Sequence, residues 1–308
     1  MKKIHKCFNI CNLMSDYIIK SYQEDFIEEQ VVVGTKVLKD WKFFGQTSAE
    51  RLKELYSAED FDPETRIYCF KDEKMVGFLN AAVREENGKK YGFLRFPYVL
   101  PEHEKVADLL FERIEHVFKK KGITKLQGVA GEIWGSTIEQ SKKWGFKEMG
   151  NSFSVYTLDV SSASVDAKSQ EDIVEFEHTR DVEKMIEIFM NEYGQSREAA
   201  ELNFKTIKEY EGPFIAHYVV HKDDTIVARA FAFVADTDDP TTANQGNMYI
   251  TDESYRQPLQ AKLINSCKEA KIKTLQTYFN PQTQHLIEVS EKLGFKCSVE
   301  TKLFEKEI

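Results

Sequence analysis

The sequence predicts a mixed α/β protein made of two similar halves in tandem, each with a central, mostly antiparallel sheet flanked by helices. Three observations predict this fold class. The chain has 308 residues, and single hydrophobic cores stop growing at about 250–300 residues. SKKWGFK at 141–147 and SEKLGFK at 290–296 agree at five of seven positions, 149 residues apart. A hairpin pattern also occurs twice, at nearly the same spacing.

The repeated hairpin lies near the middle of each half. FKDEKMVGFLNAAV at 70–83 and HKDDTIVARAFAFV at 221–234 match at five positions with an offset of 151. Each reads as strand, acidic turn, strand. Each also follows a run rich in β-branched and aromatic residues, TRIYC or FIAHYVV, which favours a strand.

The elements after the hairpin follow the same order in both halves. A third strand is expected at 91–100 and at 246–251. Apolar residues at helical spacing then predict a helix at 104–122, with a counterpart at 258–273. Short strands follow, TKLQGVA and KTLQTYF, and then the two helices that end in Gly-Phe. The last strands are FSVYTLDV and SVETKLFEK.

The two halves open differently. The second begins with a strand and a helix whose expected N-cap is Thr179 and whose end is Gly194. In the first half, only a helix near residues 16–30 is expected before the one in SAERLKELY.

A linker separates the halves. Residues 161–172 are rich in serine and poor in large apolar side chains, which is typical of linkers. The predicted domains are therefore 1–164 and 165–308.

Composition narrows the function. Residues 1–160 hold 25 basic and 25 acidic residues, whereas 161–308 hold 17 and 26. The acidic half argues against nucleic acid as a partner. The excess of negative charge would attract a cationic ligand such as an amine. The alternative is that this charge only keeps the protein in solution.

No membrane span and no metal site are expected. No run of 18 apolar residues occurs, and the N-terminus lacks the pattern of a signal peptide. The five cysteines are irregularly spaced, which favours reduced thiols in a cytoplasmic protein. His217 and His221 lie in an expected strand, and no metal site is expected at this pair.

The order β-α-α-β-β-β-α-β-α-β-β resembles that of the GNAT superfamily of acyl-CoA-dependent N-acyltransferases, over about residues 60–160 and 171–308. The Gly-Phe at Gly145 and at Gly294 is similar to the superfamily's Tyr-x-x-x-Gly-Phe. The resemblance implies a tandem of two GNAT-like domains with splayed sheets. It also implies acetyl-CoA as the acyl donor.

The resemblance implies a cofactor site in the second half. In the superfamily, backbone N–H groups at a helix start hold the CoA pyrophosphate within (Arg/Gln)-x-x-Gly-x-(Gly/Ala). The second half keeps the first and last positions of this motif and has Leu259 at the central glycine, whereas the first half keeps only Ala107. An Asn often ends the strand beside the cofactor arm. The implied site residues are Arg256, Gln257, Leu259, Ala261 and Asn280.

The resemblance also points to the residue that would act as general acid. The superfamily uses the tyrosine four residues before the glycine to reprotonate the CoA thiolate. Here both positions are serine, Ser141 and Ser290. A thiolate of pKa ~8.5 is already a tolerable leaving group, so Ser290 stays a candidate. The nearest tyrosine candidate in the second half is Tyr278, on an expected strand.

A general base for the amine is expected at the end of the third strand. Asp252 or Glu253 would serve in the second half, with Glu102 or His103 as counterparts in the first. Backbone N–H groups near Ile250 and Thr251 would hold the acyl oxygen.

These residues lead to three hypotheses. In the first, the domain at 165–308 transfers an acetyl group from acetyl-CoA to an amine of a small molecule or peptide, by direct attack in a ternary complex, beside a degenerate first domain. In the second, the pair is an inactive binding or scaffold module. The third is an aminoacyl transferase of the peptidoglycan-bridge type, which would need a basic surface for tRNA.

Overall fold

The computed structural model describes residues 16–42, 45–59, 61–86, 88–163, 172–209, 214–234 and 239–308. The chain forms two compact units. The N-terminal unit comprises residues up to 152 together with 300–308, and the C-terminal unit comprises 153–299. The predicted domain boundary near residue 165 lies outside the described residues and stays a prediction.

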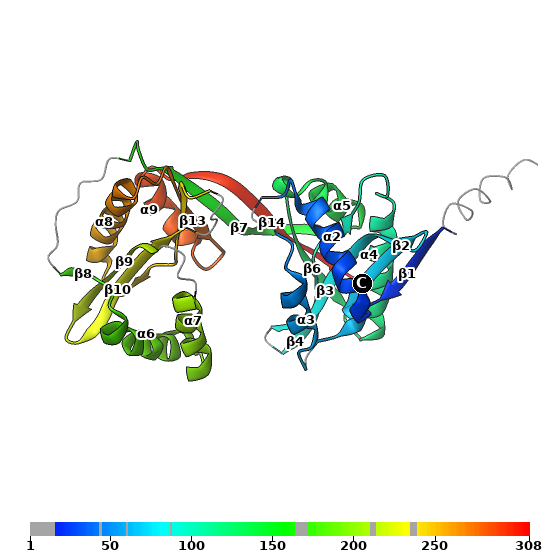
Figure 1. Cartoon of the computed structure of the whole chain (residues 1–308), viewed down its shortest axis with the longest axis horizontal. Helices are drawn as coiled ribbons and strands as arrows, with labels where there is room; N and C mark the ends of the chain where they lie inside the picture. The colour runs from blue at the N-terminus through cyan, green and yellow to red at the C-terminus, as the bar shows by residue number, and fades with distance from the viewer. Residues whose placement is uncertain are drawn as a thin grey trace, which may run out of the picture. The chain divides into compact units, whose positions relative to one another are not determined.

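The N-terminal unit is a sheet with helices (Figure 1). Its strands lie in the order β1-β2-β3-β4-β6-β14-β7, and β5 pairs with β3. β4 and β6 are parallel, and β1–β2, β2–β3, β3–β4 and β6–β14 are antiparallel. The elements are β1 (Tyr17–Ser21), α2 (Ile27–Leu38), α3 (Ala49–Tyr56), β2 (Arg66–Lys71), β3 (Lys74–Glu86), β4 (Lys89–Leu94), β5 (Tyr98–Val99), α4 (Val106–Lys120), β6 (Lys125–Gly131), α5 (Thr137–Lys143), β7 (Lys147–Asp159) and β14 (Lys296–Glu307).

The C-terminal unit has a second sheet of the same kind. Its strand order is β14-β7-β13-β11-β10-β9-β8, and β12 pairs with β10. Here β11 and β13 are the parallel pair. Its remaining elements are β8 (Ile173–Glu175), α6 (His178–Tyr193), α7 (Arg197–Glu209), β9 (Phe214–Lys222), β10 (Thr225–Phe233), β11 (Thr242–Gln245), β12 (Tyr249–Ile250), α8 (Arg256–Glu269), β13 (Thr274–Phe279) and α9 (Ile287–Lys292).

The two predicted hairpins are confirmed as β2–β3 and β9–β10. Their turns are alike in backbone conformation: Asp72 and Glu73 have φ of 48° and 63°, and Asp223 and Asp224 have 49° and 64°. Two consecutive left-handed residues define the turn whose twist matches that of the flanking strands. Asp tolerates this conformation better than most residues.

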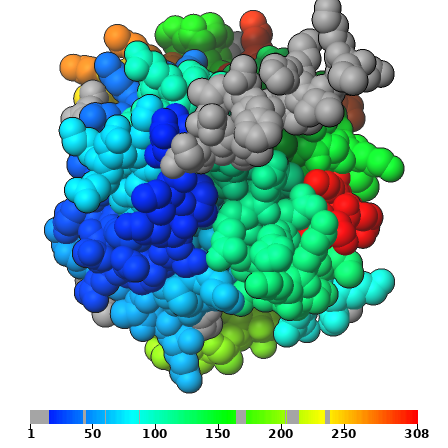
Figure 2. All heavy atoms as spheres, turned by 90° about the vertical axis from the view of Figure 1, so that its right-hand side faces the viewer, coloured from blue at the N-terminus to red at the C-terminus, as the bar shows by residue number. Residues whose placement is uncertain are grey.

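The last strand of the chain completes the sheet of the first half. Thr301 to Glu307 pair antiparallel with Gly131 to Lys125 of β6. Phe304 is fully buried in the core under α4, and the Ile308 N–H donates to the Thr124 carbonyl. The red end of the chain lies against green atoms of this unit in Figure 2. The sequence predicts the strand but not its partner.

Two predictions about element starts are wrong. The helix expected near residues 16–30 is instead strand β1, paired with β2, and α2 begins only at Ile27. The segment Tyr17–Ser21 alternates between half-buried and exposed side chains, which is the period of a strand. Glu177, not Thr179, is the N-cap of α6, whereas the end at Gly194 in a left-handed conformation is confirmed.

No helix among the described residues is long and apolar enough to cross a membrane.

The core of the C-terminal unit contains a histidine that should make it sensitive to acid. The Arg229 Nε donates to His217 Nε2 at 2.8 Å, and Phe176 stacks on the imidazole at 3.9 Å. Burial, with the Arg229 cation beside it, lowers the pKa of His217 to about 2. The ordinary pKa of a histidine is 6.5. At a pH below this value, His217 therefore binds a proton in the unfolded chain but not in the folded chain.

The free energy of unfolding of this unit should consequently fall with pH below about 6.5, by up to about 1.4 kcal/mol per pH unit. His217→Gln should remove this dependence, because a side-chain oxygen can still accept from Arg229 and does not titrate. Urea unfolding followed by circular dichroism at about pH 7 and about pH 5 measures the difference. Equal pH dependence in both proteins would contradict the assignment.

Candidate functional site

The two parallel strands of the C-terminal unit separate part-way along their length. β11 and β13 pair only from Thr242/Thr274 to Asn244/Gln276. Beyond that point β13 continues along β7, and the chain after β11 continues along β10 as β12. A cavity of about 60 Å³ lies where the strands diverge. Its lining comprises Gln245, Gly246, Asn247, Met248, Arg256, Gln260, Thr277, Tyr278, Phe279, Thr283, Leu286, Val289, Ser290 and Leu293.

A β-bulge forms one wall of this cavity. The Gly246 N–H donates to the Phe231 carbonyl at 3.0 Å, and Tyr249 pairs with Arg229. On β10, one residue lies between Phe231 and Arg229. On the opposite strand, two residues lie between their partners Gly246 and Tyr249, so this strand has one extra residue. The extra residue leaves part of the bulge out of the ladder. Met248 lines the cavity, and among the described residues no backbone carbonyl accepts from its N–H.

The N-terminal unit has the same bulge with a different residue in it. The Arg95 N–H donates to the Asn80 carbonyl at 2.9 Å, and Tyr98 pairs with Phe78. The position equivalent to Met248 is Pro97. Proline has no N–H, so this unit lacks the donor.

Aromatic side chains also fill the splay of the N-terminal unit. Phe96 and Trp144 stack with ring centroids 5.8 Å apart, and Phe111 stacks on the other side of Trp144 at 4.3 Å. A Cβ on Gly128 would lie 3.4 Å from the Phe96 ring, so this ring sits directly against β6. Ser141 is fully buried there and donates to the Thr137 carbonyl.

The start of α8 carries the predicted phosphate-binding residues. Leu259 and Ala261 are buried in the core, so the leucine at the superfamily's glycine position puts no side chain on the outer side of the helix. Arg256 is largely buried and forms two hydrogen bonds of 2.6 Å with Glu253. A helix N-terminus with an arginine fits a pyrophosphate, although Pro258 removes one N–H from the first turn.

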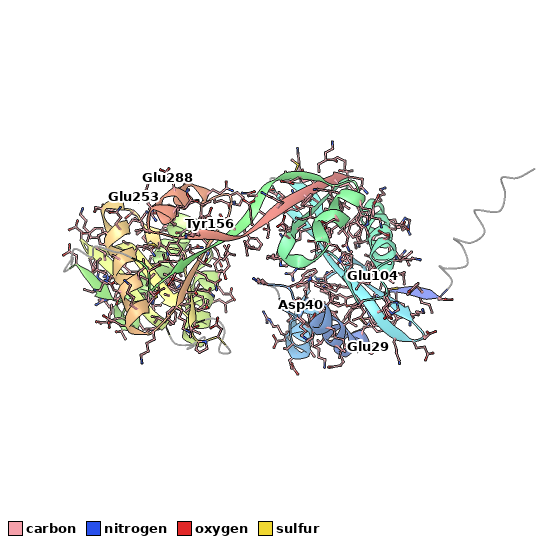
Figure 3. All side chains as sticks on the ribbon, turned by 90° about the horizontal axis from the view of Figure 1, so that it is seen from above. Glu29, Asp40, Glu104, Tyr156, Glu253 and Glu288 are labelled. Carbon is pink, nitrogen blue, oxygen red and sulfur yellow. The ribbon has the colours of Figure 1, made fainter. Side chains whose placement is uncertain are left out.

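Asp252 and Glu253, the predicted bases, are held in their ionised forms. Asp252 accepts from the Ser254 N–H at 3.1 Å and the Ser254 hydroxyl at 2.6 Å, and these bonds lower the pKa of Asp252. The ion pair with Arg256 lowers the pKa of Glu253, which Figure 3 labels just before α8. A lowered pKa makes each carboxylate a weaker base. Their catalytic role stays a prediction.

The remaining predicted residues fall in three places. The Thr251 N–H and hydroxyl both donate to the Val227 carbonyl, at 2.9 and 3.0 Å, so alternation along the strand turns the Ile250 N–H to the opposite side. The Asn280 side chain accepts from the N–H groups of Gln282 and Thr283, which follow it in the same turn. Only Ser290 of this group lines the cavity.

The cavity also contains the tyrosine candidate of the second half and an amide pair that was not predicted. Tyr278 lines it from β13 and donates to the Asn244 side chain at 3.4 Å. Burial raises the pKa of Tyr278. Gln245 and Gln260 form a buried amide pair, at 3.0 and 2.6 Å, that joins β11 to α8. The β-rich run TLQTYF indicates that Tyr278 lies on a strand, but not which neighbours it meets.

Within the described part of the chain, no group of three or more His, Cys, Asp or Glu side chains is placed to hold a metal ion.

Comparison with known proteins shows likeness in structure but not in sequence. No protein-family model and no curated protein matches the chain. A tandem GNAT protein from the clavulanic acid biosynthesis pathway aligns with a TM-score of 0.64 at 12% identity, covering 94% of this chain and 98% of its own. A GCN5-related N-acetyltransferase from Sphaerobacter thermophilus aligns at 0.62 and 11%, covering 95% and 96%.

A probable N-acyltransferase from Enterococcus faecalis also aligns, with a TM-score of 0.56 at 10% identity over 95% of this chain and 73% of its own. Structures this divergent in sequence share a fold, and function has to be argued from the site. The chain thus has the tandem GNAT fold that the order of its elements predicts.

Proposed function

We propose that the C-terminal unit transfers an acetyl group from acetyl-CoA to an amine, and that the N-terminal unit carries out no acyl transfer. The observation that carries this proposal is the contrast between Met248 and Pro97 at one position of the same bulge. A free backbone N–H beside a cavity can hold the thioester oxygen, on which negative charge develops during attack. The unit with proline has no such donor, and aromatic rings fill its splay.

The cavity supports a short acyl group. Its volume is about 60 Å³, well below the ≈ 300–1,000 Å³ of pockets for larger ligands. A cavity this small favours an acetyl group over a long acyl chain. The excess of acidic residues after residue 160 supports a cationic acceptor, an amine on a small molecule or peptide.

Each residue of the site has a role in this proposal. Arg256 and the first turn of α8 would hold the pyrophosphate, the Met248 N–H would hold the thioester oxygen, and the amine would attack directly. Bound acetyl-CoA supplies the activated acyl group. Tyr278, on the cavity wall, would be the proton donor to the departing thiolate, in place of the tyrosine that Ser290 replaces. Its raised pKa keeps the phenol protonated, although it also makes the phenol a weaker acid.

The Arg256–Glu253 ion pair provides the test. Since the Glu253 carboxylate neutralises the Arg256 guanidinium and accepts from its Nε and Nη2, it competes with a phosphate, and Glu253→Gln should tighten acetyl-CoA binding severalfold. Arg256→Gln should weaken it by at least about tenfold, the loss expected for charge-assisted hydrogen bonds. Calorimetric titration of each variant with acetyl-CoA measures both effects.

The same titration separates transfer from a binding or scaffold role. No heat of binding at millimolar acetyl-CoA would contradict acyl transfer and favour the scaffold. Arg51→Gln is the control, since this arginine is exposed on α3 and pairs with Glu54. If Glu253 is instead the base, Glu253→Gln should lower kcat while it tightens binding, so turnover is measured in parallel.

A further inference from the structure

The N-terminal unit contains a polar cavity that is separate from the splay. It has a volume of about 240 Å³ and lies on the side of the sheet that α2 and α3 cover. Its floor is a row of residues across three neighbouring strands. Arg66 on β2 pairs with Asn80 on β3, and the Arg95 N–H donates to the Asn80 carbonyl at 2.9 Å.

Two buried side-chain atoms in this row have no partner in the described part of the chain, the Arg66 Nε and the Asn80 Oδ1. The Arg66 guanidinium is otherwise fixed. Its Nη1 donates to Thr65 Oγ1 at 2.9 Å and also to the Ala81 carbonyl, and it lies 5.4 Å from the Tyr56 ring. A buried donor or acceptor without a partner destabilises the folded state, so this pair points to a ligand that supplies one acceptor and one donor.

The positive charge of the cavity indicates that the ligand's acceptor group is an anion. Three arginines line it, Arg66, Arg84 and Arg95, and none of the described lining residues is acidic. Arg84 is exposed and lies 3.8 Å from the Phe93 ring, at the edge of the cavity. Arginines attract carboxylates, which accept two N–H bonds side by side.

The C-terminal unit has a different row at the same three register positions. His217 pairs with Phe231, and the Gly246 N–H donates to the Phe231 carbonyl. The Phe231 ring lies so close to Gly246 that a Cβ there would come within 1.9 Å of it. The polar row is therefore particular to the N-terminal unit, the one whose splay is filled.

We infer that this cavity binds a small organic acid that also carries a hydroxyl or amino group. The carboxylate accepts from the Arg66 Nε and from the guanidinium groups of Arg84 and Arg95, and the hydroxyl or amino group donates to the Asn80 Oδ1. The volume suits a metabolite smaller than a drug-sized ligand, for which pockets of ≈ 300–1,000 Å³ are usual. Binding requires neither CoA nor acyl transfer.

Calorimetric titration of the full chain with millimolar L-malate, L-glutamate, succinate and inorganic phosphate tests this site. At least one of the first two should bind, and L-malate should bind more tightly than succinate, which lacks the hydroxyl. Arg66→Gln should weaken binding by at least about tenfold. Arg84→Gln, at an exposed side chain, should weaken it even if Arg66→Gln fails to fold.

Asn80→Leu should remove the preference for L-malate over succinate and leave succinate binding unchanged. Arg197→Gln, at an exposed side chain of α7 that pairs with Glu183 and Glu201, serves as the matched control and should bind these acids as the parent chain does. The inference would be overturned by binding of phosphate alone, by binding of none of the probes, or by Arg66→Gln and Arg84→Gln variants that bind the acids as tightly as the parent chain.

Discussion

Phe304→Ala is expected to lower the free energy of unfolding of the N-terminal unit by about 3–5 kcal/mol, the cost of truncating a buried phenylalanine. Phe304 is fully buried among side chains of the first half, including Leu110, Ile114 and Phe118 of α4. Its strand, β14, lies between β6 and β7 in the sheet.

The three tryptophans of the chain provide a reporter for this unit alone. Trp41, Trp134 and Trp144 all lie within residues 1–152. Denaturant unfolding followed by tryptophan fluorescence should therefore shift strongly in Phe304→Ala. The matched control is Phe295→Ala, since Phe295 is 2% exposed in the core of the C-terminal unit. It should shift this transition much less.

The domain division predicted from the sequence, at residues 164 and 165, leads to the opposite expectation for the tryptophan signal. Phe295 and Phe304 would then belong to the same domain, and neither substitution would change the tryptophan signal. A fluorescence transition that is unchanged in Phe304→Ala would show that the last strand does not stabilise the first half.

Local features of the fold could be predicted from the sequence, whereas strand partners could not. The acidic hairpin turns and the Gly-Phe helix ends depend on residues close together in the chain, and both halves repeat them. The place of β14 in the sheet depends on pairing with β6, where the partners are 170 to 182 residues earlier in the chain. Alternation of side chains identifies a strand but not the strand beside it.

The candidate site shows the same limit. The sequence identified the start of α8 and the serines that replace tyrosine, because the superfamily's motif has a fixed spacing there. It could not show that Glu253 forms an ion pair with Arg256, since an ion pair depends on side-chain conformation. It also could not show the bulge, because an extra residue becomes visible only when two strands are paired.

Met248→Pro is expected to lower kcat for acetyl transfer by about 10²–10³, the usual loss when one donor to a developing oxyanion is removed. The substitution removes the Met248 N–H, from which no backbone carbonyl of the described residues accepts a hydrogen bond. Proline at this position should not unfold the protein, because Pro97 occupies the equivalent position of the other bulge. Met248→Leu is the control, since it keeps the N–H and nearly the same side-chain volume.

A second readout requires no knowledge of the amine. The Met248 N–H would contact the thioester oxygen, which CoA itself lacks, so the parent chain should bind acetyl-CoA more tightly than CoA. One hydrogen bond contributes about 1 kcal/mol, or roughly fivefold in the dissociation constant. Met248→Pro should abolish this difference and leave CoA binding unchanged, whereas Met248→Leu should preserve it. If Met248→Pro binds both ligands as the parent chain does, the bulge does not hold the acyl group, and the contrast with Pro97 no longer distinguishes the two units.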